Sequence, residues 1–165
     1  MRRGFPLLLF AIRRCLERGS KSPARSESSD GTCASPGPHC WTNVYALSAS
    51  GSAPDGPLYT DFLAALNVNS SSDGNSFCFA NHCDWRIPTI GELQAIISPW
   101  HACTTSPCID PIFGPTQDGN YWSSTSLTGQ PSVAWIGFFN AFNGGAIDRL
   151  PEDTTLFARA VRGGR

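Results

Sequence analysis

Apolar residues recur with a helical period in one segment near the middle of the chain, residues 82–97, HCDWRIPTIGELQAII. Ile90, Leu93 and Ile97 are spaced so that they fall on one face of an α-helix. A Ser-Pro pair follows at residues 98–99, where a helix is expected to end. The pattern predicts a short amphipathic helix with one face in the core.

Both helices that we expect have a candidate N-cap. Thr89 precedes Glu92 by three residues, the spacing of a capping box, in which the two side chains satisfy amides of the first turn. Earlier in the chain, Thr60 or Asp61 could cap a second short helix. That helix would carry the apolar residues Phe62, Leu63, Ala65 and Leu66.

The carboxyl-terminal third has the pattern of a β-meander. Its candidate strands are residues 121–124, 133–140, 146–150 and 156–161. The second of these, VAWIGFFN, is apolar on both faces, which predicts a covered strand in the middle of a sheet. Residues 41–47 suggest a first strand. Together with the two helices, these strands predict an α+β fold with a small, mainly antiparallel sheet and long loops.

Composition favours a single domain of residues 41–165 that is rich in loops. The chain has 165 residues, enough for one core, and only 15% of them are charged. Ser, Thr, Asn and Gly supply most of the polarity instead. This balance is more typical of an extracellular module than of a helical cytosolic enzyme.

We expect residues 1–40 to be a flexible leader or linker. Its basic start and the apolar run 5–12 have the outline of a secretory signal, which Arg13 and Arg14 interrupt. An imperfect signal and a misassigned start both fit this pattern. The run is too short to cross a membrane as a helix, which needs about 20 residues. Residues 15–40 are too polar to offset the entropy cost of ordering.

The charge of the expected domain argues against polyanionic partners. Residues 41–165 hold five Arg, no Lys and ten Asp or Glu, a net charge of −5. Nucleic acids and sulfated polymers are bound by clustered Lys and Arg. We therefore expect no nucleic-acid partner.

Six cysteines lie beyond residue 30, in addition to Cys15 of the leader. Cys78 and Cys83 share their spacing with Cys103 and Cys108, and Cys33 and Cys40 complete the set. An even number in a compact, Ser- and Gly-rich module indicates disulfides in an oxidising compartment. We favour the local pairs 78–83 and 103–108. Zinc is the alternative, because His39, His82 and His101 are close to Cys in sequence.

Five segments occur in an order that resembles the bacterial DUF1566 family, the carboxyl-terminal domain of the Legionella collagen-like adhesin. They are CDWRIPTIGELQAI, CIDPIFGP, YWSSTS, AWIGFF and FARAVRGG, and they cover roughly residues 45–165. The resemblance implies a C-type-lectin-like fold, with AWIGFF as a core strand and residues 85–87 as the entry to the second helix. The first strand that is usual in the family has no match in residues 1–44.

The resemblance also implies a non-catalytic module. The similar fold of formylglycine-generating enzymes uses a late cysteine pair, and no cysteine follows Cys108 here. Calcium needs six to eight oxygen ligands, and Asp148, Glu152 and Asp153 make no recognisable set. We expect no enzyme activity, no cofactor and no metal site. The sulfated polysaccharides bound by the best-known family member suit this acidic chain poorly.

Most conspicuous side chains are better explained by structure than by function. Arg86 lies between Trp85 and Ile87, and we expect it to pair with Asp84 or Glu92. Arg159 and Arg162 are expected to belong to the scaffold. Trp85, Trp122 and Trp135 are expected in the core, whereas Trp41 and Trp100 could be exposed.

The remaining candidates for recognition are three loop segments, residues 125–132, 140–145 and 148–155. Their mixture of amide, glycine, aromatic and charged residues resembles that of antibody loops. We expect Asn140, Phe142, Asn143, Asp148 and Arg149 to form one exposed ligand-binding patch.

Three functional hypotheses stay open at this point. The first is a secreted or surface-displayed binding module, adhesin-like or receptor-like, with an unknown glycan or protein ligand. The second is a structural zinc- or disulfide-stapled module of a larger assembly without its own ligand. The third is a retroelement-diversified receptor domain. We expect the chain to lie outside the cytoplasm, in the periplasm, at the cell surface or secreted.

Overall fold

The computed structural model describes residues 43–67, 78–79, 82–97, 103, 105–110, 113 and 116–163. The expected leader at residues 1–40, with Cys15, Cys33 and Cys40, lies outside the described residues. So do Trp41, Trp100, His39 and His101.

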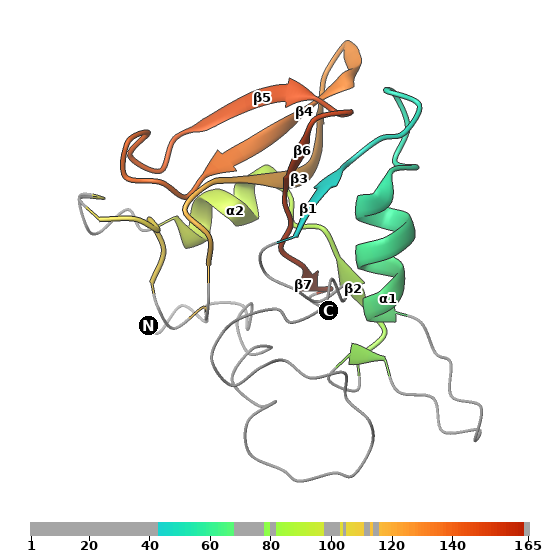
Figure 1. The fold of residues 1–165 in the computed structure, drawn as a ribbon, viewed down its shortest axis with the longest axis horizontal. Helices are drawn as coiled ribbons and strands as arrows, with labels where there is room; N and C mark the ends of the chain where they lie inside the picture. The colour runs from blue at the N-terminus through green and yellow to red at the C-terminus, as the bar shows by residue number, and fades with distance from the viewer. Residues whose placement is uncertain are drawn as a thin grey trace, which may run out of the picture.

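The described residues form two sheets, and the larger has five strands in the order β1-β6-β3-β4-β5 (Figure 1). Its strands are β1 (Val44–Ala46), β3 (Asn120–Leu127), β4 (Gln130–Phe138), β5 (Ile147–Pro151) and β6 (Thr155–Phe157). Neighbours pair in antiparallel fashion, except that β3 and β6 run parallel. The prediction of strands around residues 121–124, 133–140 and 146–150 is confirmed.

Two hydrophobic clusters cover opposite faces of β4, as its apolar pattern predicted. On one face, Ala134 and Ile136 pack in a cluster with Leu58 and Phe62. Phe139, which follows the strand, packs in the other cluster with Leu93 and Tyr121. Trp85 and Trp122 are buried as expected, whereas Trp135 is only half-buried.

The first helical segment begins earlier than its expected cap. A π-helical stretch η1 (Leu58–Leu63) continues directly into α1 (Ala64–Asn67), so Thr60 and Asp61 lie inside the helix, and neither of them caps it. Gly56 makes this early start possible. Its amide donates to the carbonyl of Leu47, and a Cβ at this position would collide with the backbone of β1.

The second helix, α2 (Ile90–Ile96), begins as predicted. The Thr89 hydroxyl accepts a hydrogen bond from the Glu92 amide, and the Glu92 carboxylate accepts one from the Thr89 amide at 2.8 Å. The capping box is therefore confirmed. Leu93 and Ile96 are buried on the face that α2 turns toward β3 and β4.

The expected strand at residues 156–161 is wrong, because the chain changes sheets there. β6 ends at Phe157, and β7 (Val161–Arg162) pairs instead with β2 (Trp85–Arg86) in a separate two-stranded sheet. Between them, Arg159 donates to the carbonyl of Phe113 at 3.1 Å. An apolar run alone cannot tell which strand it will pair with.

Two of the three expected loop segments also contain regular structure. Residues 125–132 form the end of β3, a tight turn at Thr128 and Gly129, and the start of β4. Residues 148–151 belong to β5, and Glu152 after them is buried. With two short helical elements and a mostly antiparallel sheet, the fold is α+β.

Candidate functional site

The turn between β4 and β5, residues 139–146, presents the most exposed large apolar side chain of the described residues. Phe142 is 96% exposed, and the next such residue, Val44 in β1, is 47% exposed. Ala141 and Asn143 on either side are half-buried. Phe142 thus projects from a turn whose neighbouring residues pack against the domain.

The turn is ordered internally by its own polar groups. The Asn140 side-chain oxygen accepts a hydrogen bond from the Asn143 amide at 2.8 Å. The Asn143 carbonyl in turn accepts from the Ala146 amide at 3.0 Å. Gly144 and Gly145 have φ angles of 59° and 75°, in the left-handed region that favours glycine. Asn140 and Asn143 therefore shape the turn as well as flanking Phe142.

A second loop holds the turn from outside. Cys103 and Cys108 form a disulfide, with their Cα atoms 5.3 Å apart. Within this loop the Ser106 hydroxyl accepts a hydrogen bond from the Ala141 amide at 2.8 Å. The Cys108 amide donates to the Phe139 carbonyl, also at 2.8 Å. The base of the turn is thereby fixed to the disulfide loop by two hydrogen bonds.

Asp148 and Arg149 lie apart from the turn, on opposite faces of β5. Asp148 pairs with Ile136 and Arg149 with Trp135, and successive residues of a strand point to opposite sides of the sheet. The structure thus brings Asn140, Phe142 and Asn143 together in the turn, whereas the other two candidates follow on the adjoining strand.

Asp148 also protects the edge of the sheet. β5 is the last strand, and its hydrogen-bonded pairs with β4 leave the Arg149 amide pointing outward. The Asp148 carboxylate accepts a hydrogen bond from that amide at 2.8 Å. Pro151 has no amide hydrogen to offer. An edge blunted in this way is a poor template for adding another strand.

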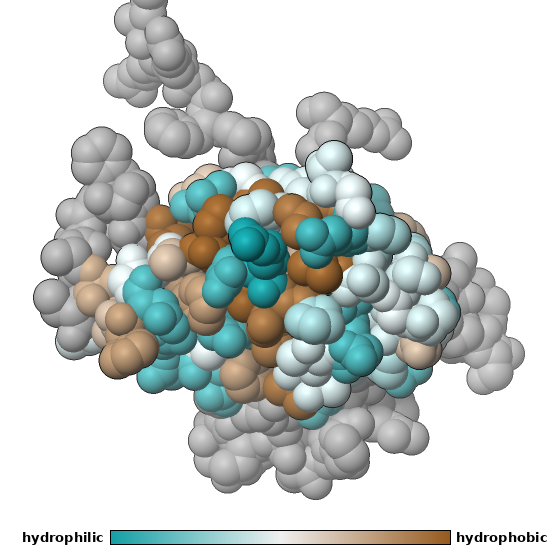
Figure 2. All heavy atoms as spheres, turned by 90° about the horizontal axis from the view of Figure 1, so that it is seen from above, coloured by the Kyte–Doolittle hydropathy of each residue, from teal (hydrophilic) through white to brown (hydrophobic). Residues whose placement is uncertain are grey.

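The surface above β4 and β5 contains both apolar and hydrophilic residues. Figure 2 looks down on the side where β4 and β5 lie at the top of Figure 1, and apolar residues there are interleaved with hydrophilic ones. The described residues contain no cluster of three or more His, Cys, Asp or Glu that could hold a metal ion.

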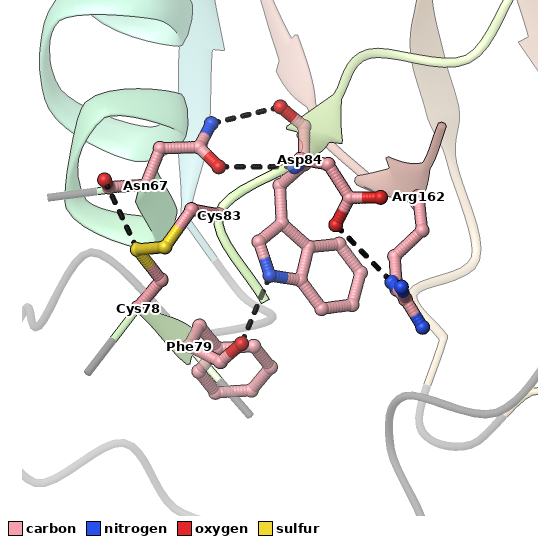
Figure 3. The surroundings of a disulfide bond; sticks show 7 residues. Asn67, Cys78, Phe79, Cys83, Asp84 and Arg162 are labelled. Carbon is pink, nitrogen blue, oxygen red and sulfur yellow. Dashed lines mark hydrogen bonds and ion pairs between the residues drawn. A yellow bond between two sulfur atoms is a disulfide. The ribbon is translucent and has the colours of Figure 1, made fainter. Parts of the chain in front are cut away.

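The second disulfide, Cys78–Cys83, lies in a different setting, next to the core (Figure 3). The Asn67 side chain at the end of α1 accepts from the Trp85 amide at 2.9 Å and donates to the Trp85 carbonyl at 2.8 Å. The Trp85 indole donates to the Phe79 carbonyl at 3.0 Å. The Cys78 sulfur lies 3.3 Å from the Asn67 carbonyl oxygen. The pairings 78–83 and 103–108 are both confirmed.

Charged side chains near β2 pair internally, as expected for scaffold residues. Arg86 binds Glu92 through two hydrogen bonds, at 2.6 and 2.7 Å. This hydrogen bonding, together with that from Thr89, lowers the pKa of Glu92 from 4.5 to about 2. Asp84 pairs instead with Arg162 at 3.2 Å, and this hydrogen bond lowers the pKa of Asp84.

Arg159 is also a scaffold residue. Its guanidinium lies 6.0 Å from the centre of the Tyr121 ring and donates to the Thr116 hydroxyl. Desolvation by burial lowers the pKa of Arg159. These contacts tie the segment between β6 and β7 to the segment that precedes β3.

The sequence did not predict three residues whose side chains join distant segments: Ser106, Asn67 and Glu152. Ser106 bonds to a residue 35 positions away, and Asn67 to one 18 positions away. Glu152 was expected in a loop but is 2% exposed, and its carboxylate accepts from the Ser126 hydroxyl at 3.0 Å. None of the three has a local spacing signal, although a Ser-Pro step inside a cysteine loop could have drawn attention to Ser106.

Comparison with known proteins gives one positive result. No curated protein matches the chain, and no solved structure matches it. Among the described residues no helix is long and apolar enough to cross a membrane. The model of the Lcl C-terminal domain family matches residues 21–162, most of the chain, and confirms the resemblance noted in the sequence. The chain belongs to the Lcl C-terminal domain family.

Proposed function

We propose that residues 41–165 form a secreted or surface-displayed binding module of C-type-lectin-like fold, adhesin-like or receptor-like and without enzyme activity. Its ligand is a glycan or a protein, recognised through the carboxyl-terminal loops. Phe142 is the centre of the contact surface, with Asn140 and Asn143 beside it. Asp148 and Arg149 contribute from the adjoining strand.

The observation that carries this proposal is the exposure of Phe142 on an ordered turn. A large apolar side chain that is 96% exposed contributes little to folding, and it becomes an anchor when a partner covers it. The turn is fixed before any ligand arrives, which reduces the entropy cost of binding. Membership of the Lcl C-terminal domain family and the two disulfides support a location outside the cytoplasm.

The test is a binding screen of the full chain on an array of glycans and extracellular proteins. Phe142→Ala should abolish the signal that the unmodified chain gives. Val44→Ala is the matched control, because Val44 is the other exposed large apolar residue among the described residues and lies in β1 at the opposite edge of the sheet. Equal binding by all three proteins would contradict the proposal. Absence of any ligand would favour the alternative of a disulfide-stapled structural module.

A further inference from the structure

The internal contacts of the turn that carries Phe142 shape it, but they do not orient it relative to the rest of the domain. It contains two consecutive glycines, and glycine loses more conformational freedom on folding than any other residue. Its Phe side chain is exposed and contributes no packing to the domain. The two internal hydrogen bonds through Asn140 and Asn143 shape the turn but do not fix its direction relative to the sheet.

The Cys103–Cys108 loop helps to fix this direction, in addition to the hydrogen bond from the Phe139 amide to the Gly119 carbonyl. The Ala141 amide, directly before Phe142, donates to the Ser106 hydroxyl, and the Phe139 carbonyl accepts from the Cys108 amide. On the far side of the turn, a Cβ at Gly145 would collide with Ile97 and would contact Cys108. The loop is therefore hydrogen-bonded to the turn before Phe142 and lies close to it after Phe142.

The disulfide loop is itself attached to the core. Ile109, next to Cys108, forms a β-bridge with Ile97 at the end of α2, and both side chains are buried in the cluster that also holds Phe139. The path from the core to the exposed aromatic ring thus runs through α2, the bridge, the disulfide loop and the turn.

We infer that the Cys103–Cys108 loop positions the Phe142 turn for recognition, and that Ser106 is the positioning residue that makes the contact. This inference rests on the proposed function for its purpose, but the positioning itself can be measured without any ligand. The Cys78–Cys83 disulfide lies elsewhere, beside Asn67 and Trp85.

The experiment compares the full chain with two double variants, Cys103→Ser/Cys108→Ser and Cys78→Ser/Cys83→Ser. The two disulfides close loops of the same length, since both have a sequence separation of 5. Two readouts need no ligand: exchange of the Ala141 and Asn143 amides with deuterium, and the rate of chymotrypsin cleavage after Phe142. Loss of the 103–108 disulfide should raise both rates in the folded protein, whereas loss of the 78–83 disulfide should leave them near those of the unmodified chain.

A single substitution keeps the test decisive if the double variant fails to fold. Ser106→Ala removes only the hydroxyl that accepts from the Ala141 amide, and should raise exchange of that amide about 2- to 10-fold, the effect of one lost hydrogen bond. Ser106→Thr keeps a hydroxyl and should restore slow exchange. Thr105→Ala, which truncates an exposed hydroxyl one residue away, is the matched control.

The same variants are then applied to the array of glycans and extracellular proteins. Weaker binding by Ser106→Ala, rescued by Ser106→Thr, supports the inference together with the proposed function. Unchanged amide exchange in both Ser106→Ala and the 103–108 variant would overturn the inference, whether or not Phe142 binds a ligand. Faster exchange in these variants, with no binding by any protein on the array, would leave the positioning established and count against the proposed function.

Discussion

The two disulfide loops of this domain have the same size but hold different kinds of structure. Their Cα–Cα distances are 5.1 Å for Cys78–Cys83 and 5.3 Å for Cys103–Cys108. The first lies beside Trp85, which is 5% exposed, and the second beside the turn of Phe142, which is 96% exposed. Disulfides that close loops of the same length therefore lie beside the core in one region and beside an exposed turn in the other.

The polar contacts around Trp85 also differ from those around the Phe142 turn. The Asn67 side chain forms hydrogen bonds with the backbone amide and carbonyl of Trp85, and the Trp85 indole donates a hydrogen bond to the Phe79 carbonyl. Both ion pairs found among the described residues adjoin β2, one through Asp84 and the other through Arg86. The Phe142 turn is held by neutral hydrogen bonds. The comparison predicts that loss of an aromatic side chain and exposure to acid affect the first region far more than the second.

The largest effect is expected from Trp85→Ala. Removing a buried aromatic ring leaves a cavity, and it also removes the indole hydrogen bond to the Phe79 carbonyl. The free energy of unfolding should fall by about 3–5 kcal/mol. Urea unfolding followed by circular dichroism measures this loss. A loss below about 1 kcal/mol would show that this region does not contribute to the core as its burial indicates.

The disulfide variants should each cost less, and they should cost similar amounts. Loop-closure entropy for a loop this short gives about 2 kcal/mol for either bond. Because both bonds have a sequence separation of 5, this contribution from the unfolded state cancels in the difference between the variants. Thermal unfolding of Cys78→Ser/Cys83→Ser and Cys103→Ser/Cys108→Ser under non-reducing conditions measures the loss of stability in each variant.

A difference between the two variants would then report on their native contacts. Greater loss at residues 78 and 83 is expected if Asn67 and Trp85 move when the staple is absent. Greater loss at residues 103 and 108 would reverse the comparison, and would indicate that the exposed turn contributes more to stability than the region beside the core.

Features set by local spacing were the ones that the sequence could predict. The capping box needs only Thr89 and Glu92 three residues apart, and a disulfide of separation 5 needs little more than nearby cysteines. Apolar residues on both faces of β4 predict that this strand is covered on both sides. In each case the partners are close in sequence or the signal is repeated along the chain.

The rest depends on polar contacts between distant segments. Nothing near Asn67 indicates that it will bond the backbone of Trp85, and nothing near Glu152 indicates burial against Ser126. The split of residues 156–161 into β6 and β7 depends on which neighbours are available, since both parts look like strand. The candidate turn could be located from Gly144 and Gly145, but its support by Ser106 could not.

Acid should weaken the charged region by a smaller amount. Since the pKa of Glu92 is lowered to about 2 in the folded protein, its ionised form contributes stability above pH 4.5. That stability is lost as the pH falls from 4.5 through 2. The contribution is on the order of 1 kcal/mol or less, because Arg86 is partly exposed and solvent screens the pair.

Glu92→Gln isolates this contribution. Urea unfolding at pH 7 and at pH 2.5 should show a smaller acid-induced loss in the variant than in the unmodified chain. The pKa of Asp55 is also lowered to about 2, by the Ala49 and Ser50 amides. Asp55 is present in both proteins, so its contribution to the acid-induced loss cancels in the comparison. Parallel pH profiles for the two proteins would mean that the pair of Arg86 and Glu92 does not form in solution.

The smallest effect on stability is expected from Phe142→Ala, although it replaces a side chain of the same class as Trp85. The ring is 96% exposed, so it leaves no cavity, and the free energy of unfolding should change by less than about 0.5 kcal/mol. The backbone bonds of the turn, from Ala141 to Ser106 and from Asn143 to Asn140, do not involve the ring and should persist. Urea unfolding gives the stability, and amide exchange at Ala141 and Asn143 gives the order of the turn. Together with Trp85→Ala, this variant should show that one aromatic ring is needed for folding and that the other is not. If Phe142→Ala instead lowers stability by several kcal/mol, the ring is packed in solution and the two regions are alike.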